Sequence, residues 1–435
     1  MDEILAKQRI VVAGLGLTGQ SVVRFLTGLG VTVNVWDTRT EAAVPSWIDV
    51  PVTLGMVDAQ FWTGTDMLIL SPGISPAHPG VSLAREAGVE VIGDIELFAR
   101  LSRTPLLGIT GSNGKTTVTL LLTHILTGAG LKACAAGNVG RPVLDTLGEN
   151  WDALVLELSS FQLETTSSLG LQGATLLNIS DDHLDRHGSL VEYADTKQRI
   201  FLHCEHAVVW RDHDECMPHS SVATTTRYGL DNTNTDFGFR DNAITWQGKP
   251  ILNMAEVKLV GTHNVLNIQA ALGLSQIAGV PLDEACNSVK SFEPAPHRCV
   301  QISQRGGVHW IDDSKATNVG ATLAALEGIG KQKKGKLILI AGGDGKGADL
   351  SVLQSALLRY VDVLITLGKN GPDIASLFHD VHPVSDLPTA VRLASEQAVA
   401  GDTVLLSPAC ASIDMFENYR HRAEVFANAI AEVDA

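Results

Sequence analysis

Residues 106–117 read Leu-Leu-Gly-Ile-Thr-Gly-Ser-Asn-Gly-Lys-Thr-Thr and are the most informative stretch of the chain. An apolar run leads into a glycine-rich turn, and residues 118–126 then have the character of a helix. In such a strand–turn–helix, the turn's N–H groups and the helix N-terminus face one concavity and favour phosphate. Lys115 is placed to reach the β- and γ-phosphates of a nucleotide, and the Thr116 hydroxyl to bind Mg²⁺.

This turn departs by one position from the usual phosphate-loop spacing, G-x-x-x-x-G-K-[ST]. Counting back from Gly114, the first glycine is expected where the chain has Ile109, and Gly108 misses by one. The alternative is an ordinary glycine turn before a helix. We favour the phosphate loop because the strand, turn, lysine, paired threonines and helix all agree.

The same order of β-branched run, glycine-rich turn and helical stretch recurs in three blocks and predicts an α/β fold with parallel sheets. We expect a Rossmann-like N-terminal domain at residues 1–93, a P-loop ATPase-like central domain at 94–295 and a Rossmann-like C-terminal domain at 296–435. The predicted strands are residues 10–13, 31–36, 67–70, 105–109, 153–158, 174–179, 309–311, 336–340, 361–367 and 403–406. Residues 207–248 are polar and are expected to form strands and loops that decorate the second block.

The composition of the chain argues against some classes of function. With 32 Lys and Arg against 48 Asp and Glu, the 435-residue chain has a formal charge of −16, which argues against sequence-independent nucleic-acid binding. An anionic substrate therefore needs a local concentration of cations and helix N-termini. The six cysteines are scattered without a CxxC pair, as expected for free thiols in a reducing compartment. A polar start and the lack of about 18 consecutive apolar residues predict a cytoplasmic protein without signal peptide or membrane helix.

Acidic and histidine side chains follow two further predicted strands. Glu157 ends one apolar run, where it either binds Mg²⁺ or simply faces solvent. Residues 181–187, Asp-Asp-His-Leu-Asp-Arg-His, follow the next strand, and so many acids together favour a cation. The spacing does not suit zinc, and oxygen-rich ligation favours Mg²⁺. Lys197 lies on a predicted helix, and its chemistry alone indicates a surface lysine paired with acids.

A second glycine-rich turn lies near the N-terminus. Residues 14–19, Gly-Leu-Gly-Leu-Thr-Gly, follow a strand, and Asp37 ends the next one, as in a dinucleotide-binding fingerprint. A nicotinamide-dependent dehydrogenase is one interpretation. Because an ATP loop follows downstream and residues 71–73, Ser-Pro-Gly, add a tight turn at the same edge, we favour a nucleotide that serves as a substrate handle.

With these motifs in place, the whole chain resembles the Mur ligase family. Residues 111–117 look like that family's ATP loop, which explains the missing first glycine. Residues 157–162 and 178–185 look like its Mg²⁺ segments. Two further segments are typical of the members that add D-glutamate: residues 313–318, Asp-Ser-Lys-Ala-Thr-Asn, and residues 407–419, which begin Ser-Pro-Ala-Cys and end at Tyr419, where a Phe would be familiar.

The resemblance implies an ATP-dependent amide ligase with ATP and Mg²⁺ as cofactors. It implies addition of D-glutamate to UDP-N-acetylmuramoyl-L-alanine through an acyl phosphate, in the cytoplasmic synthesis of peptidoglycan precursors for the cell wall. The partners implied are these small molecules, with no nucleic acid or membrane, and we expect a monomer. The alternatives are another Mur or folylpolyglutamate-type ligase, the dehydrogenase, and a non-catalytic nucleotide-gated binding protein.

The resemblance also implies a role for individual residues. The catalytic set is Lys115, Glu157, His183 and Lys197. The metal set is Thr116, Glu157, His183 and Lys197, the last resembling the family's carbamylated lysine. ATP is expected to contact Gly111, Ser112, Asn113, Gly114, Lys115, Thr116, Thr117, Asn264, Asn267, Arg298 and Asp313. The UDP substrate is expected at Gly14, Leu15, Thr18, Asp37, Thr38, Arg39, Ser71, Pro72 and Gly73, with Asn138 and His183 on its muramoyl part. D-Glutamate is expected at Lys315, Thr317, Lys346, Ser412 and Tyr419.

Overall fold

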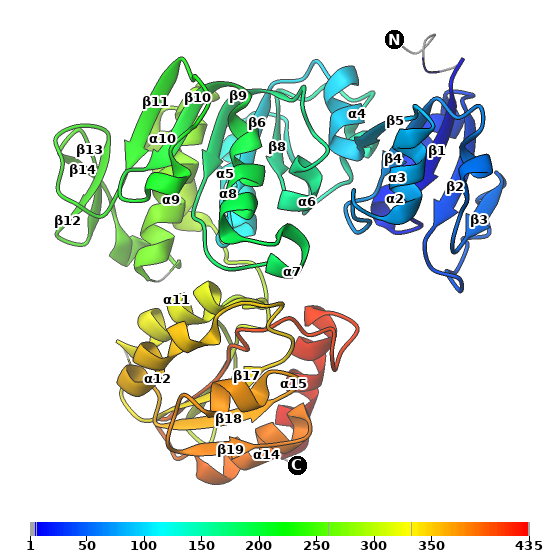
Figure 1. Cartoon of the computed structure of the whole chain (residues 1–435). Coiled ribbons are helices and arrows are strands. Elements are labelled where there is room, and N and C mark those ends of the chain that lie inside the picture. The colour runs from blue at the N-terminus through cyan, green and yellow to red at the C-terminus, as the bar shows by residue number, and fades with distance from the viewer. Residues whose placement is uncertain (1–4, 6, 260, 332, 434–435) are drawn as a thin grey trace.

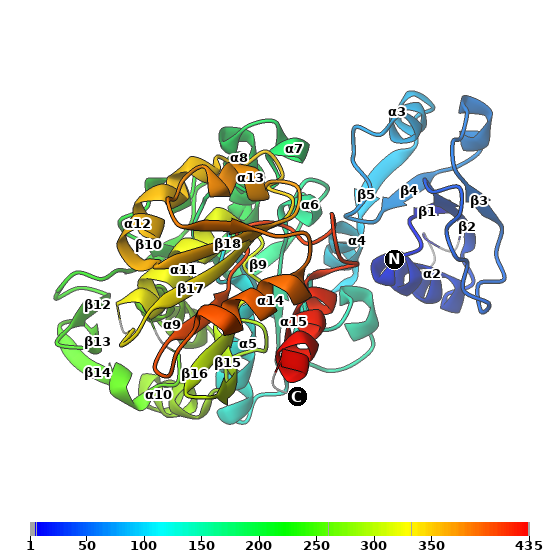
Figure 2. The ribbon, with the colours of Figure 1, turned by 90° about the horizontal axis from the view of Figure 1, so that it is seen from below.

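The computed structural model describes residues 5, 7–259, 261–331 and 333–433 (Figure 1). It is an α/β protein of three domains, each built on its own sheet. The second domain lies in the middle, with the first domain at one end. The third domain packs across it, as the view from below also shows (Figure 2).

The first sheet has the order β3-β2-β1-β4-β5, and all of its pairings are parallel. Its strands are β1 (Arg9–Ala13), β2 (Thr32–Asp37), β3 (Val52–Leu54), β4 (Met67–Leu70) and β5 (Glu90–Gly93). The helices are α2 (Leu17–Gly28) and α3 (Pro79–Glu86), and α4 (Asp94–Leu101) leads into the second domain. The chain runs from β1 to β2 and β3 on one side of β1, and then crosses to β4 and β5 on its other side. Ligands of such sheets bind at the carboxyl ends of the strands, beside the point where the strand order reverses.

The second sheet has the order β11-β10-β9-β6-β8-β7 and is also parallel. Its strands are β6 (Leu106–Thr110), β7 (Ala133–Gly137), β8 (Ala153–Glu157), β9 (Gly170–Leu176), β10 (His203–Trp210) and β11 (Thr224–Tyr228). Alternate side chains of β6 point to opposite faces: Leu107 and Ile109 pack with one helical layer, and Leu106 packs in the other core. The helices are α5 (Lys115–Gly128), α6 (Ser160–Leu163), α7 (Leu184–His187), α8 (Leu190–Gln198), α9 (Thr262–Ile277) and α10 (Leu282–Ser291).

The segment 207–248 does more than decorate this domain. Two of its strands, β10 and β11, extend the main sheet in parallel register. The remainder, with the residues that follow it, forms a separate antiparallel sheet of β12 (Phe237–Arg240), β13 (Ala243–Trp246) and β14 (Lys249–Asn253). The polar sequence concealed β11 because four of its five residues are exposed or only partly buried at the sheet edge.

The third sheet has the order β15-β16-β20-β17-β18-β19, and only the β15–β16 pairing is antiparallel. Its strands are β15 (Val300–Arg305), β16 (Val308–Asp312), β17 (Leu337–Gly342), β18 (Val363–Leu367), β19 (Val381–Pro383) and β20 (Thr403–Leu406). Its helices are α11 (Val319–Gly330), α12 (Gln354–Tyr360), α13 (Gly371–Ala375), α14 (Leu387–Gln397) and α15 (Tyr419–Val433). Two separate apolar clusters, one on each face, make it a three-layer unit.

The predicted fold class and the predicted strands are confirmed, with shifts of up to four residues at the strand ends. The domain limits after residues 93 and 295 stay a prediction, which the distribution of strands among the three sheets supports. Among the described helices, none combines the length and apolarity that crossing a membrane requires.

Candidate active site

A cavity of about 1370 Å³ is lined by residues of the second and third domains. It collects residues from strand ends and loops of both. Those that the sequence predicts and the cavity contains are Pro72, Ser112, Asn113, Gly114, Lys115, Thr116, Thr117, Asn138, Glu157, His183, Lys197, Asn264, Asn267, Arg298, Asp313, Lys315, Thr317, Lys346, Ser412 and Tyr419. The residues predicted for ATP, metal and D-glutamate therefore line one cavity, except Gly111, which is absent from its lining.

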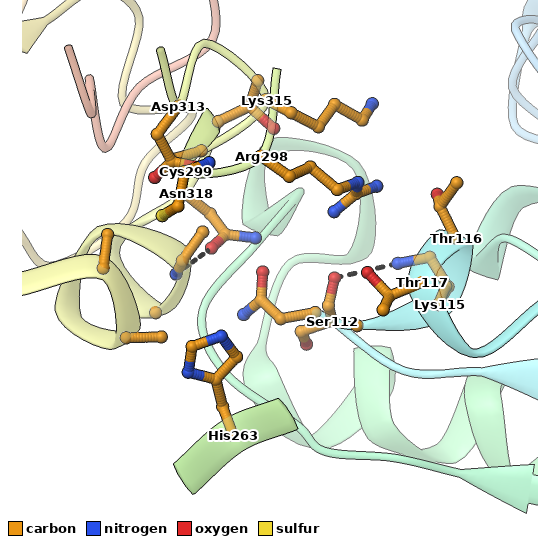
Figure 3. A pocket seen from close by; sticks show the side chains of 18 of the residues that line it. Ser112, Lys115, Thr116, Thr117, His263, Arg298, Cys299, Asp313, Lys315 and Asn318 are labelled. Atoms are coloured by element: carbon orange, nitrogen blue, oxygen red, sulfur yellow. Dashed lines mark hydrogen bonds between the residues drawn. The ribbon is translucent and has the colours of Figure 1, made fainter. Parts of the chain in front are cut away.

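The phosphate loop connects β6 to α5 and is held open by its neighbours. Gly114 has a φ of 85°, and a Cβ there would lie 2.5 Å from Oδ1 of Asn267, so only glycine fits. Asn178 fixes the loop twice: its Oδ1 accepts from the Asn113 amide at 2.8 Å, and its Nδ2 donates to the Asn113 carbonyl at 3.0 Å. The Lys115 ammonium donates to the carbonyls of Gly111 (2.6 Å) and Ser112 (2.8 Å) (Figure 3). Lys115 thus lies at the loop itself, where phosphate oxygens would replace those carbonyls.

Glu157 ends β8, directly beside the β6 strand that carries the phosphate loop. Its side chain is buried, with Oε1 accepting from Asn138 Nδ2 at 2.6 Å. The second oxygen, Oε2, is buried and has no hydrogen-bond partner among the described residues. A buried carboxylate oxygen without a donor fits a divalent cation. The described residues contain no group of three or more His, Cys, Asp or Glu side chains suited to a metal, so hydroxyl and phosphate oxygens would complete the coordination.

His183 lines the same cavity as Glu157 and adopts a left-handed backbone with φ of 55°. Its ring meets the Phe161 ring edge-on, with centroids 4.7 Å apart. Burial lowers the pKa of His183 to about 4 and outweighs the opposing charge of Asp182. The imidazole is therefore neutral at pH 7, which is the form that can coordinate a cation.

Lys197 contradicts the surface interpretation that its chemistry alone suggested. It sits on α8 and is only 1% exposed. Its ammonium donates to the Gly111 carbonyl at 3.0 Å and the Thr110 hydroxyl at 3.3 Å, and within the described ranges it forms no ion pair with an acid. Burial, and next the charge of Lys115, lower its pKa well below the usual lysine value. Such an amine is readily deprotonated and nucleophilic.

The cavity concentrates positive charge in an acidic protein. Burial, then the nearby charges of Arg298 and Lys115, lower the pKa of Lys315 to about 8. The Lys315 ammonium lies 4.1 Å from the Tyr419 ring centroid, and Arg298 extends toward the phosphate loop (Figure 3). Burial lowers the pKa of Arg298 as well. Cations crowded in this way are unfavourable by themselves and are stabilised by anionic ligands.

Asp313 lies on the far side of Arg298, after β16. Its carboxylate accepts from the Ser407 hydroxyl at 2.7 Å and the Cys299 amide at 3.2 Å. Burial raises the pKa of Asp313 to about 7 despite these donors. It is thus a buried polar group able to receive hydrogen bonds at this end of the cavity.

Asp182 belongs to the acid cluster that the sequence predicts for a cation, but it was not among the individual residues assigned to the metal. It is buried, and it contacts two side chains of the third domain: it pairs with the Lys346 ammonium and accepts from Asn318 Nδ2 at 3.2 Å. These contacts span 164 and 136 residues of sequence. The acids and histidines of residues 181–187 were the local signal for Asp182, and nothing in the local sequence identifies its partners.

The residues predicted for the UDP end lie apart from this cavity, at the carboxyl ends of β1, β2 and β4, with Pro72 as the exception. A Cβ on Gly14 (φ 99°) would lie 2.7 Å from Ser71 Oγ, and that buried hydroxyl has no partner among the described groups. The Asp37 carboxylate accepts from the Leu15 amide at 2.9 Å and from Arg39. Its side-chain hydrogen bond with Arg39 is the main reason why the pKa of Asp37 falls to about 2.

An arginine joins this first-domain edge to the cavity. Arg186 of α7 donates to the carbonyls of Pro72 (3.2 Å) and Ile74 (3.3 Å), and also to Glu164. A ligand that extends from the first domain past Pro72 would therefore enter the cavity near His183.

Comparison with known proteins finds matches in all three domains. Residues 8–93 match the Mur ligase MurD-like N-terminal domain, 109–275 the Mur ligase middle domain and 297–410 the Mur ligase glutamate ligase domain. The UDP-N-acetylmuramoylalanine–D-glutamate ligase of Idiomarina loihiensis is 42% identical over 449 residues, which cover 97% of this chain and 96% of that protein. The enzyme of that name from Marinobacter nauticus is 42% identical over 98% of both chains.

Solved structures share the fold at low sequence identity. MurC, the UDP-N-acetylmuramate-alanine ligase of Thermotoga maritima, superposes with a TM-score of 0.64 at 18% identity, covering 98% of this chain and 99% of its own. MurF ligase of the same organism, solved with ADP, gives 0.62 at 16%, covering 99% and 97%. With relatives above 40% identity over nearly the full length, the chain belongs to the Mur ligase family.

Proposed function

We propose that this protein is the ATP-dependent ligase that joins D-glutamate to UDP-N-acetylmuramoyl-L-alanine in peptidoglycan precursor synthesis. Relatives that share about two fifths of its residues over the full chain carry that name. The observation that carries the proposal is the shared cavity, which places a phosphate loop, a buried carboxylate oxygen without a partner among the described residues and several cationic side chains together. Lys115, Arg298, Lys315 and Lys346 are among these cations.

The chemistry begins with two anions that repel each other, the substrate carboxylate and the γ-phosphate of ATP. Lys115 and Arg298 reduce that repulsion, and the loop amides align the phosphate for in-line attack. The carboxylate oxygen attacks phosphorus, ADP leaves, and an acyl phosphate forms. The amine of D-glutamate then attacks the carbonyl carbon, and inorganic phosphate leaves with the new amide formed. Closure between two domains excludes the water that would hydrolyse the acyl phosphate.

Magnesium fits this site. Thr116, Glu157, His183 and a carbamylated Lys197 would hold it, and it would supply charge neutralisation and orientation for the phosphates. We assign the adenosine to Asn264, Asn267, Arg298 and Asp313, and the UDP end to the first-domain edge around Gly14, Asp37 and Ser71. Thr317, Ser412 and Tyr419 join Lys315 and Lys346 in the D-glutamate site. A monomer acting in the cytoplasm is part of this proposal.

Lys197→Ala is expected to lower activity on the order of 100-fold, the upper effect of losing a group that supports a metal site. The buried amine, with its lowered pKa, can add CO₂ to become an anionic carbamate. Formate or acetate should therefore restore part of the variant's activity by supplying the missing carboxylate. Initial rates with and without the acid test this, and a variant that no short acid restores would contradict the carbamate.

Activity should also depend on the protonation of Lys315. Because its pKa is lowered to about 8, Lys315 loses its charge as the pH rises through that value, and binding of an anionic amino acid weakens. We expect kcat/KM for D-glutamate to fall between pH 7 and 9, and to fall less in Lys315→Arg, which stays charged. The ratio of the two profiles isolates Lys315 from the titration of D-glutamate itself. Parallel profiles would show that Lys315 does not bind the substrate.

A substrate panel tests the proposed function. ADP release should require the UDP-linked acceptor and D-glutamate together, and L-glutamate or other amino acids should not replace it. Release with neither substrate, or hydride transfer with a nicotinamide cofactor, would contradict the assignment.

A further inference from the structure

Only four acidic side chains line the cavity among the described residues: Glu157, Asp182, Glu293 and Asp313. Three of them are committed elsewhere. Glu157 presents its unpaired oxygen beside the phosphate loop, Glu293 is an exposed rim residue paired with Lys258, and Asp313 is held by Ser407 and Cys299 at the opposite end. Asp182 is the acid that remains for a cationic group of a ligand.

The position of Asp182 relates it to the chemistry as well as to the third domain. The Ser112 hydroxyl of the phosphate loop donates to the Ser180 carbonyl at 3.0 Å and accepts from the Ser180 amide at 2.9 Å, which places Asp182, two residues on, near the loop. It follows β9 in the second domain, and its partner Lys346 follows β17 in the third. Both side chains of this pair are about nine-tenths buried. The pair is therefore shielded from solvent at the point where the two domains meet.

The buried pair of Asp182 and Lys346 carries the same two charges as the zwitterion of an amino acid. An α-amino acid carries an ammonium and a carboxylate on one carbon, so the two charges can insert between Asp182 and Lys346 with each meeting its opposite. Two ion pairs would then replace one, without leaving either protein charge unpaired in the interior. An amino acid in the opposite orientation would place its ammonium against Lys346 and its carboxylate against Asp182, so like charges would meet at both ends.

We propose that Asp182 binds the ammonium group of D-glutamate and, with Lys346, positions its nitrogen beside the acyl phosphate. The ammonium releases one proton to solvent, and the free amine then attacks the carbonyl carbon while inorganic phosphate leaves. This inference rests on the proposed function. Asn318 keeps the acid in place meanwhile, because its Oδ1 caps α11 through the Ala321 amide at 3.0 Å while its Nδ2 donates to Asp182. Lys346 is likewise fixed by its backbone, whose amide donates to Asp344 Oδ1 at 3.0 Å.

The contacts of Asp182 agree with this role. One carboxylate oxygen faces the Lys346 ammonium, and the other accepts from Asn318 Nδ2 at 3.2 Å. The carboxylate thus already accepts from an ammonium, as the recognition of the amino group requires.

The test compares D-glutamate with glutarate, which has both carboxylates but no amine. In Asp182→Asn, the KM for D-glutamate should rise about 10- to 100-fold, the range for losing a hydrogen bond between charged groups. The inhibition constant of glutarate should change less than about threefold. If Asp182 merely positions Lys346, the two ligands will weaken by the same factor, and that result would overturn the proposal, as would an unchanged KM.

Hydroxylamine separates this inference from the proposed function and checks that the variant is folded. It is largely uncharged at neutral pH and traps an acyl phosphate as a hydroxamate without using the amino-acid site. Asp182→Asn should form hydroxamate from ATP and the UDP-linked acceptor at near the wild-type rate, and Glu293→Gln should match wild type in every assay. No hydroxamate from the wild type would overturn the proposed function and this inference with it. Loss in the variant alone would overturn only the assignment of Asp182.

Discussion

Replacing Lys115 by alanine should lower kcat/KM on the order of 10³-fold, the upper effect of removing one preorganised group that stabilises transition-state charge. In the structure, the ammonium lies within hydrogen-bonding distance of two carbonyls of the phosphate loop. Oxygens of bound phosphate are better acceptors for this ammonium than the carbonyls are. The ammonium also stabilises the charge that develops on the phosphoryl group during transfer. Steady-state ADP release and nucleotide affinity should both be measured, because the loss is expected mainly in kcat.

Lys132→Ala is the matched control. Lys132 is exposed, pairs with Glu149 and lies outside the cavity, so its loss should change activity less than twofold. Lys115→Ala with full turnover would contradict the phosphate loop. A variant that lost nucleotide affinity while the wild type formed no amide would instead favour a nucleotide-gated binding protein.

Replacing Glu157 by glutamine should lower activity by about 10²- to 10³-fold and raise the Mg²⁺ concentration needed for half-maximal rate. The change keeps the size of the side chain and an oxygen for Asn138, but it removes the negative charge of the unpaired carboxylate. Mg²⁺ titrations of the initial rate should therefore separate the variant from wild type.

The control for this experiment is Glu149→Gln, an exposed acid outside the cavity that should leave the Mg²⁺ dependence unchanged. An identical Mg²⁺ profile in Glu157→Gln would mean that the unpaired oxygen does not serve a metal. The predicted metal set would then need another acid at its centre.

The sequence alone predicted the features of this protein that depend on residues close together in the chain. The phosphate loop was predictable because a strand, glycines and a helix N-terminus lie within 20 consecutive residues and together define one geometry. Glu157 was predictable as a strand-end acid, since its neighbour β6 carries the loop. The parallel sheets followed from repeated β-branched runs with helical connections.

The rest depended on contacts that no local pattern encodes. Lys197 lies in a short polar helix whose sequence resembles an exposed one, and its burial comes from packing beside Thr110 and Gly111. The pair of Asp182 and Lys346 joins segments 164 residues apart, and it exists because two domains close on each other. Polar β11 resembled a loop because an edge strand has no second neighbour to bury it.

The central claim is that the substrate carboxylate takes phosphate from ATP before the amine attacks. The most direct measurement uses UDP-N-acetylmuramoyl-L-alanine labelled with ¹⁸O in its alanyl carboxylate, followed by mass analysis of the inorganic phosphate released. An acyl phosphate transfers one labelled oxygen to each phosphate, and this is the result that we predict. Phosphate without label, while amide accumulates, would contradict the mechanism built on Lys115, Glu157 and their shared cavity.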